Sequence, residues 1–218
     1  MSPRPYRLGK RQESIEETRA RILDAARELL IVGDGFAGFT IDAVARQAGV
    51  ARMTVYYQFG SKVGLLEALS DDLAARGQIQ RLAEVFAQTE PLDVLDSYIA
   101  TFARFWGTDR LATRRLRALA ALDTDFEQVV RARDERRRMV LSAVLRRLRE
   151  PPGRLDDAAF DATFELLYTL TSFESFDSLA GPTRTPEEVV PLVSRLARLI
   201  LGMEIGADTG ADTGPDTS

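Results

Sequence analysis

The stretch from residue 40 to residue 60, TIDAVARQAGVARMTVYYQFG, decides the fold of this chain. Thr40 offers a hydroxyl N-cap, and Gly49 stands where the chain needs a positive φ after a helix. Two short helices, 41–48 and 51–59, are therefore predicted around a tight turn. The positions that would pack them together carry small or apolar residues: Val44, Ala45, Ala48, Val50 and Val55. The pattern is typical of a helix-turn-helix, although an ordinary tight helical hairpin would show it too.

One part of this stretch conflicts with a helical interpretation. Residues 54–59 are rich in β-branched and aromatic side chains, so their propensity alone predicts a strand. The chain offers no second strand nearby with which such a strand would pair. A helix over 54–59 therefore requires tertiary packing to override local propensity, and the residues alone leave this conflict open.

Outward from this stretch, the rest of the chain is predicted to be helical. Before it, apolar residues from Ile22 to Leu30 recur at the spacing of one helix face. Beyond it, N-caps, prolines and apolar periodicity predict further helices over 61–73, 91–105, 109–121, 123–148, 156–179 and 186–203. The expected fold is all-α with about nine helices. It comprises a three-helix domain with the helix-turn-helix over 15–62 and a larger helical domain over 63–206.

Both ends of the chain are predicted to lie outside these domains. Residues 1–14 form a basic, flexible arm that contains Arg4, Arg7, Lys10 and Arg11. An unordered arm is the plainer interpretation, and contact with a DNA backbone or minor groove is the other. Residues 207–218 spell ADTG, ADTG and PDTS without apolar residues, which predicts disorder. The N-terminus lacks the apolar segment of a signal peptide, and no apolar run is long enough for a membrane span, so a cytoplasmic protein is expected.

Composition closes many routes to catalysis. The 218 residues include no cysteine and no histidine, which excludes disulfides, Cys/His zinc sites, Cys nucleophiles and histidine general bases. No Gly-rich phosphate loop follows a strand. No catalytic residue, metal or cofactor is therefore predicted, and the chain is not expected to be an enzyme. The net charge is −4, yet residues 1–62 carry 10 Lys/Arg against 7 Asp/Glu, a basic balance that suits a nucleic acid partner.

A series of short motifs runs through the N-terminal third in a fixed order. They are TRARILDAA at 18–26, GF at 35–36, FTI at 39–41, Ala45, AGV at 48–50, TVYY at 54–57 and FGSK at 59–62. Their order and spacing resemble the N-terminal domain of TetR/AcrR-type transcriptional regulators over about residues 15–70. The resemblance implies that residues 54–59 are helical. It also implies that the remaining residues form an all-helical ligand-binding and dimerisation domain.

In a helix-turn-helix, the N-terminal part of the second helix reaches base edges in the DNA major groove. The candidate DNA-binding residues are Thr40, Arg52, Met53, Thr54, Tyr56, Tyr57, Gln58 and Lys62. Arg52 is the preferred base reader, because arginine binds guanine O6 and N7 in a bidentate manner. Thr40 and Lys62 are expected to contact phosphate. The family pattern implies phosphate contacts for Tyr56, Tyr57 and Gln58, with core packing as the alternative for Tyr56.

Aromatic residues at helical spacing in the second domain suggest a pocket for an apolar or aromatic effector. The candidate pocket residues are Tyr98, Phe102, Phe105, Trp106, Phe126, Phe164 and Tyr168. Plain core packing explains the same pattern. The arginines between residues 131 and 138 are interpreted as a solvated face, because acidic residues are interleaved with them.

Two apolar stripes near the C-terminus predict self-association. One comprises Phe160, Phe164, Leu167 and Thr171, and the other Leu192, Leu196, Leu199 and Met203. A twofold dimer with a four-helix interface would cover both stripes. The resemblance then implies a ligand-responsive repressor that binds a pseudo-palindromic DNA operator as a homodimer and is released by a small organic effector. The alternatives are a helical small-molecule-binding protein or enzyme without sequence-specific DNA regulation, and a sequence-neutral architectural DNA-binding protein.

Overall fold

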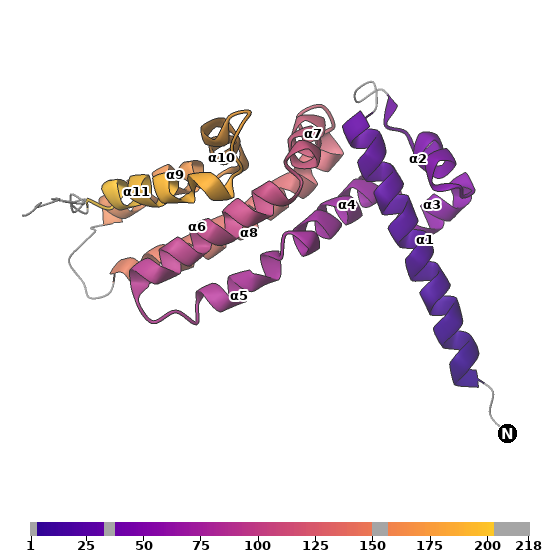
Figure 1. The fold of residues 1–218 in the computed structure, drawn as a ribbon, viewed down its shortest axis with the longest axis horizontal. Coiled ribbons are helices and arrows are strands. Elements are labelled where there is room, and N and C mark those ends of the chain that lie inside the picture. The colour runs from indigo at the N-terminus through magenta and orange to yellow at the C-terminus, as the bar shows by residue number, and fades with distance from the viewer. Residues whose placement is uncertain (1–3, 33–37, 150–156, 203–218) are drawn as a thin grey trace, which may run out of the picture.

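A computed structural model describes residues 4–32, 38–149 and 157–202 of the chain (Figure 1). The described residues form eleven α-helices and contain no strand, which confirms the all-α prediction. The helices are α1 Arg4–Val32, α2 Ile41–Ala48, α3 Arg52–Phe59, α4 Lys62–Arg76, α5 Leu82–Val85, α6 Pro91–Thr108, α7 Arg110–Ala120, α8 Thr124–Arg149, α9 Asp157–Leu170, α10 Phe173–Ala180 and α11 Val190–Ile200. Short 3-10 turns at Ile79–Arg81 and Glu187–Val189 precede α5 and α11.

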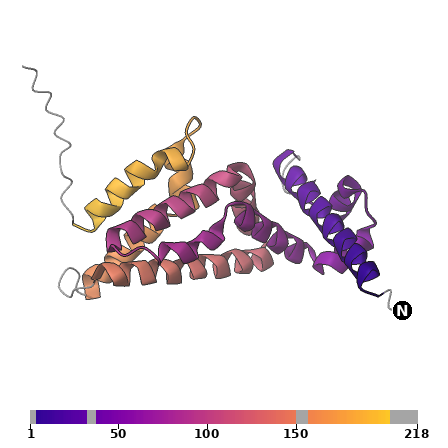
Figure 2. The ribbon, with the colours of Figure 1, turned by 60° about the horizontal axis from the view of Figure 1, so that its bottom comes forward.

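The helices separate into a small group at one end and a longer body. Figure 1 shows α1, α2 and α3 together at one end, with α6 and α8 running away from them. We call α1–α3 the head and the helices from α5 onward the body. Helix α4 joins the two, since it contacts α1 as well as α6 and α8. Figure 2 shows α8 as a long helix along the lower edge of the body. None of the helices in the described part of the chain combines the length and apolar content needed to cross a bilayer.

The first helix corrects the prediction of a flexible arm over residues 1–14. Helix α1 begins at Arg4, so from there onward the arm is part of the helix. Residues around Ile22 and Ala26 are fully buried and hold the helix in place, which allows it to extend toward the N-terminus without a new nucleation step. Pro5 lies in the first turn, where its missing N–H removes no helical hydrogen bond. The tail predicted over 207–218 lies outside the described residues.

The turn between α2 and α3 forms as the sequence predicts. The Thr40 hydroxyl accepts a hydrogen bond from the Ala43 N–H at 3.1 Å and caps α2. Gly49 has φ 66° and ψ 37°, and the following Val50 N–H donates to the Ala45 carbonyl at 3.0 Å. This bond closes the helix end in the manner of a Schellman motif, which requires the positive φ. Residues 54–59 are helical within α3. Val55 is fully buried against the other helices of the head, and this packing overrides the local preference for a strand.

Two hydrophobic clusters hold the molecule together, and the first is shared between head and body. It contains buried residues of α1–α4, together with Leu116 and Leu119 of α7 and Phe126 of α8. The second cluster joins α6, the later part of α8, α9, α10 and α11. Packing therefore continues across the domain boundary that the sequence predicts at residue 62.

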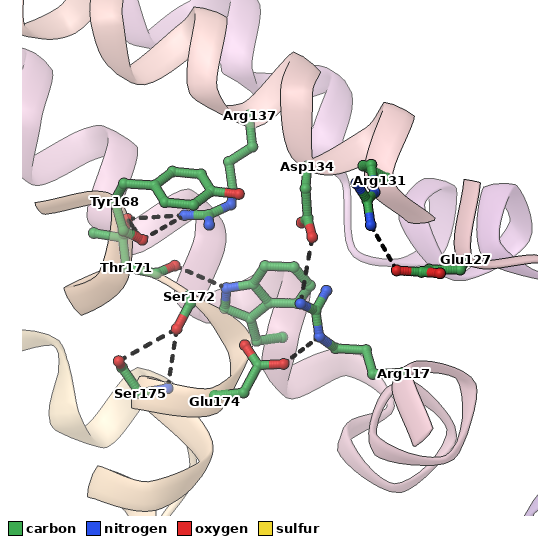
Figure 3. A network of polar contacts seen from close by, with 11 residues as sticks. Arg117, Glu127, Arg131, Asp134, Arg137, Tyr168, Thr171, Ser172, Glu174 and Ser175 are labelled. Atoms are coloured by element: carbon green, nitrogen blue, oxygen red, sulfur yellow. Dashed lines mark hydrogen bonds and ion pairs between the residues drawn. The ribbon is translucent and has the colours of Figure 1, made fainter. Parts of the chain in front are cut away.

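The helix predicted over 156–179 is two helices, α9 and α10, which is one reason why the count exceeds nine. The Thr171 hydroxyl turns back and donates to the Leu167 carbonyl at 2.7 Å. Ser172 then caps α10, accepting from the Ser175 N–H at 3.2 Å (Figure 3). Local side-chain hydrogen bonds of this kind compete with a continuous helix and end α9 here.

Candidate nucleic-acid interface

Helix α3 is held by one side and exposes the other. Val55 is fully buried, whereas the side chains of Met53 and Tyr57 are 58% and 86% exposed. Arg52 is also exposed, at the first position of the helix. The exposed side of α3 therefore offers a partner a cationic, an apolar and a hydroxyl-bearing side chain.

Arg52 is held in a defined position by two neighbours. Its Nη1 lies 3.2 Å from Asp42 Oδ2, and its Nη2 donates to the Tyr56 hydroxyl at 3.2 Å. The hydrogen bond with Tyr56, and then the charge of Asp42, raise the pKa of Arg52 above its usual value. The guanidinium thus stays charged and aligned while it remains accessible. Exposed pairs of this kind are weak, so a stronger acceptor can replace Asp42.

The other predicted DNA-binding residues surround this arginine at different depths. Thr40 is exposed, while Thr54, Gln58 and Lys62 are half-buried. The Lys62 ammonium lies 5.9 Å from the centre of the Phe39 ring. Tyr56 is half-buried and packs against the first hydrophobic cluster, and its hydroxyl receives the Arg52 hydrogen bond at the surface. The ring of Tyr56 is therefore packed as the alternative predicts, with its hydroxyl at the surface. The phosphate contact of Tyr56 stays a prediction.

Two residues that sequence reasoning did not single out shape this surface. Asp42 supplies the acidic partner of Arg52. Arg19 of α1 donates to the Gln58 carbonyl at 3.2 Å, and its guanidinium lies 4.5 Å from the centre of the Phe59 ring. Arg19 therefore fastens the C-terminal end of α3 to α1. Its position within the motif at 18–26 was visible in the sequence, but its partner 39 residues away was not.

The body contains a cavity of about 340 Å³ between α4, α6, α7 and α8. Three of the seven predicted pocket residues line it: Phe102, Phe105 and Trp106. The other four lie elsewhere. Phe126 is fully buried in the first cluster, and Tyr98 is fully buried in the second, where its burial raises its pKa although the charge of Arg137 opposes the shift. Phe164 and Tyr168 stack on each other at 6.1 Å on α9, beside Arg138.

Arg137 of α8 corrects the prediction of a solvated face, whereas Arg131 and Arg136 are exposed as predicted. Arg133, Arg136 and Arg137 line the cavity, and Arg137 is only 6% exposed. Arg137 donates to the Tyr168 carbonyl at 2.9 Å and to the Thr171 hydroxyl at 3.2 Å (Figure 3). Its guanidinium also lies 3.7 Å from the centre of the Tyr168 ring. Sequence spacing showed alternating charges but not that α6 and α9 cover this side of α8.

Ion pairs connect the helices around the cavity. Asp109 caps α7, accepting from the Ala112 N–H at 3.0 Å, and its other oxygen pairs with Arg27 of α1. Asp177 of α10 pairs with Arg110 and Arg114 of α7. Burial disfavours the charged form of Asp177, but the hydrogen bonds from these arginines outweigh it and lower its pKa below the usual value. Ion pairs therefore link helix α7 both to α1 of the head and to α10 of the body.

The stripes predicted for self-association are partly turned inward. Leu167 and Thr171 are fully buried within the chain, so they are not available to a second copy. The exposed apolar residues of α9 and α11 are Leu166, Leu192 and Leu199, at 56%, 38% and 50% exposure. Neighbouring residues of a helix point in clearly different directions, because a full turn takes about 3.6 residues. Leu166 therefore faces outward although Leu167 is buried. Met203 lies outside the described residues.

Comparison with known proteins places these features in context. Residues 22–69 match the family model described as bacterial regulatory proteins, tetR family. The transcriptional regulator SrpR of Pseudomonas putida is 48% identical over 54 residues, which cover 25% of each chain. TtgR of Pseudomonas putida is 35% identical over 82 residues, covering 37% of this chain and 39% of TtgR. The matched stretch therefore spans well under two thirds of either relative, and lies in regulators rather than enzymes.

A solved structure extends the likeness to the body. A TetR-like transcriptional regulator from Rhodococcus sp. RHA1 aligns with a TM-score of 0.65 and 22% sequence identity. The alignment covers 85% of this chain and 96% of that protein. At this level of identity the match concerns the fold, which the two proteins share across head and body.

Proposed function

We propose that this chain, which belongs to the tetR family of bacterial regulatory proteins, is a cytoplasmic transcriptional repressor. It binds a pseudo-palindromic DNA operator as a homodimer and leaves the operator when a small organic effector occupies the body. The observation that carries the proposal is the α2–α3 unit, whose exposed side presents Arg52, Met53 and Tyr57 from a firmly packed helix. The family match concerns the head, and the body contributes the cavity.

The head offers each kind of contact that operator recognition needs. Helix α3 enters the major groove, where Arg52 exchanges Asp42 for guanine O6 and N7. Met53 packs against a thymine methyl group or a neighbouring base edge. Thr40 and the N-terminus of α2 meet a phosphate, and Lys62 meets another near the start of α4. Tyr57, with most of its side chain exposed, contacts phosphate or a base edge.

Dimerisation is supported by the exposed leucines of α9 and α11. These helices contact each other, and Leu166, Leu192 and Leu199 leave an apolar surface on them. A second copy that covers this surface about a twofold axis forms a four-helix interface. Two heads related by the same axis match the two halves of a pseudo-palindrome.

The cavity supplies a route from effector to DNA. Helix α4 lines it and begins three residues after α3 ends, and α7 lines it and packs against α1. A ligand that fits best when α4 and α7 are displaced favours a dimer in which the two heads no longer match the groove spacing. By linkage, that ligand binds free protein more tightly than the DNA complex.

Selection of bound sequences from a random DNA pool tests the proposal. We expect enrichment of an inverted repeat whose half-sites lie about one or two helical turns apart. Enrichment of a single half-site would contradict the dimer, and enrichment of no sequence at all would favour a sequence-neutral DNA-binding protein. Light scattering at micromolar protein concentration tests dimerisation independently. A monomer would contradict the proposed twofold arrangement of the two heads.

A further inference from the structure

The cavity of the body contains a buried cation that no acidic side chain in the described part of the chain neutralises. Arg137 is 6% exposed and lines the cavity. Its guanidinium contacts two neutral oxygens and lies over the rings of Tyr168 and Phe102. No carboxylate among the described residues lies within ion-pair distance of its guanidinium. A buried charge without a counter-charge is costly, so this arrangement favours an anion that arrives from outside the chain.

The whole cavity lining carries an excess of positive charge. Four arginines and two aspartates line it. Asp71 pairs with Arg133 at 2.8 Å, and Asp134 pairs with Arg117 at 3.4 Å. Arg136 and Arg137 then have no acidic partner among the described side chains. This local excess is opposite in sign to the net charge of the chain, which is −4.

Two donors on the lining residues are also left without acceptors. The Nε atoms of Arg133 and Arg137 are both buried and make no hydrogen bond. The two residues are four apart on α8 and therefore lie on one face of the helix, one turn from each other. Buried donors without acceptors are rare in folded proteins, because each one loses its hydrogen bonds to water without a replacement. These two donors add to the uncompensated polar groups behind the cavity lining.

The remaining lining is apolar. Ten of the eighteen lining residues are apolar, and Phe102, Phe105 and Trp106 form an aromatic wall from α6. The Trp106 indole N–H is already engaged, since it donates to the Thr171 carbonyl at 3.2 Å. This wall therefore offers ring surface rather than hydrogen bonds to a ligand. The volume of about 340 Å³ lies at the lower end of the range for small-molecule sites.

We propose that the effector is a small organic carboxylate with an aromatic or aliphatic body. Its carboxylate binds the guanidinium of Arg137, and its body lies against Phe102, Phe105 and Trp106. Carboxylate is favoured because arginine binds it through paired hydrogen bonds, and because an apolar site of this volume suits one compact acid group. The role of this ligand as an effector rests on the proposed function. The anion site itself rests only on the cavity and its lining residues.

Matched pairs of ligands test the charge requirement. Titration calorimetry on the full-length protein at about pH 7, without DNA, compares 1-naphthoate with 1-naphthamide and octanoate with octanamide. In each pair the shape is nearly constant and only the charge changes. We expect the anion to bind at least about tenfold more tightly than its amide in one or both pairs. Equal affinities in both pairs, or no saturable binding of either anion at millimolar concentration, would overturn the proposal.

Arginine variants test the position of the anion. Arg137→Met should abolish the preference for the anion, while Arg131→Met should leave it unchanged, because Arg131 is exposed, pairs with Glu127 and does not line the cavity. Circular dichroism verifies folding, and Arg133→Met, with a reduced preference expected, replaces Arg137→Met if that variant does not fold. An unchanged preference in the folded variant would overturn the site.

The two proposals fail in different experiments. If an anion binds as described but does not release selected operator DNA, the anion site stands and its role as effector site is lost. If no inverted repeat is selected, the repressor function fails, whatever the ligand pairs show.

Discussion

Arg52 of the head and Arg137 of the body show two opposite ways to place an arginine. Arg52 lies in the open with an acidic partner at 3.2 Å and a tyrosine hydroxyl at the same distance. Arg137 is almost fully buried and has neutral oxygens and aromatic rings around it. The exposed charge is paired although water would solvate it, whereas the buried charge has no acidic partner among the residues that the structure describes.

This difference matches the ligands that we propose for each region. An arginine that binds DNA must leave its acidic partner for a phosphate or a base. A weak, exposed ion pair is therefore suitable at such a position. A closed site gains most from its ligand when the chain leaves a charge for that ligand to neutralise. Head and body nevertheless share a hydrophobic cluster, so the two regions are joined by packing as well as by the chain.

The largest effect is expected where head and body share packing. Phe126 belongs to body helix α8 but is fully buried in the cluster of the head. Phe126→Ala should lower the free energy of unfolding by about 3–5 kcal/mol, through lost burial and the cavity left behind. Urea denaturation followed by circular dichroism measures it. Phe164→Ala is the matched control and should cost less, because Phe164 is only half-buried. A loss no greater than that of the control would show that the two regions are energetically separate.

Asp177 is less exposed than Arg52 and less buried than Arg137. The charge of its carboxylate depends on pH. Asp177→Asn should lower stability by about 1.5–3 kcal/mol at neutral pH, because Arg110 and Arg114 lose a charged acceptor. The folded-state pKa of Asp177 is lowered, so its contribution is present above the unfolded pKa of about 3.9 and is lost as the pH falls through the folded value. Thermal unfolding across pH should show the two proteins converging in acid. A constant gap would contradict a role for the charge.

Arg52→Ala tests the exposed arginine directly. It should weaken binding to the selected operator by about 1–3 kcal/mol and relax specificity at one base pair. Lys62→Ala is the comparison, because a phosphate contact weakens binding to all sequences alike and lowers the salt slope by about 1. Fluorescence anisotropy on operator and scrambled DNA separates these outcomes. Equal losses for Arg52→Ala on both DNAs would refute base reading.

The smallest effect concerns the partner that Arg52 must release. Asp42→Asn should tighten operator binding by up to about 1 kcal/mol, because Arg52 then no longer leaves an ion pair and a negative charge near the DNA is removed. The same anisotropy assay measures the change, with Glu28→Gln as a control at another acidic position of the head. Weaker binding in Asp42→Asn would mean that Asp42 holds Arg52 in its working position.

Local signals in the sequence predicted the head well. Thr40, Gly49 and Ser61 act within three or four residues, so their caps and turns follow from neighbours along the chain. The body was harder, because periodicity shows that one side of a helix is apolar but not which helix covers it. Phe126 and Tyr98 have the same spacing signal as Phe102, yet only Phe102 lines the cavity. Arg137 was missed for the same reason, since its burial depends on Tyr168 and Thr171, which lie more than 30 residues away.

The side chain of Asp109 makes two separate contacts, a helix cap and an ion pair. One oxygen caps α7, and the other binds Arg27 of α1. A change at this position therefore alters the start of a body helix and its attachment to the head at once. Substitutions at positions 27 and 109 should be epistatic, since loss of either side chain removes the same bond and the second loss adds only the cap.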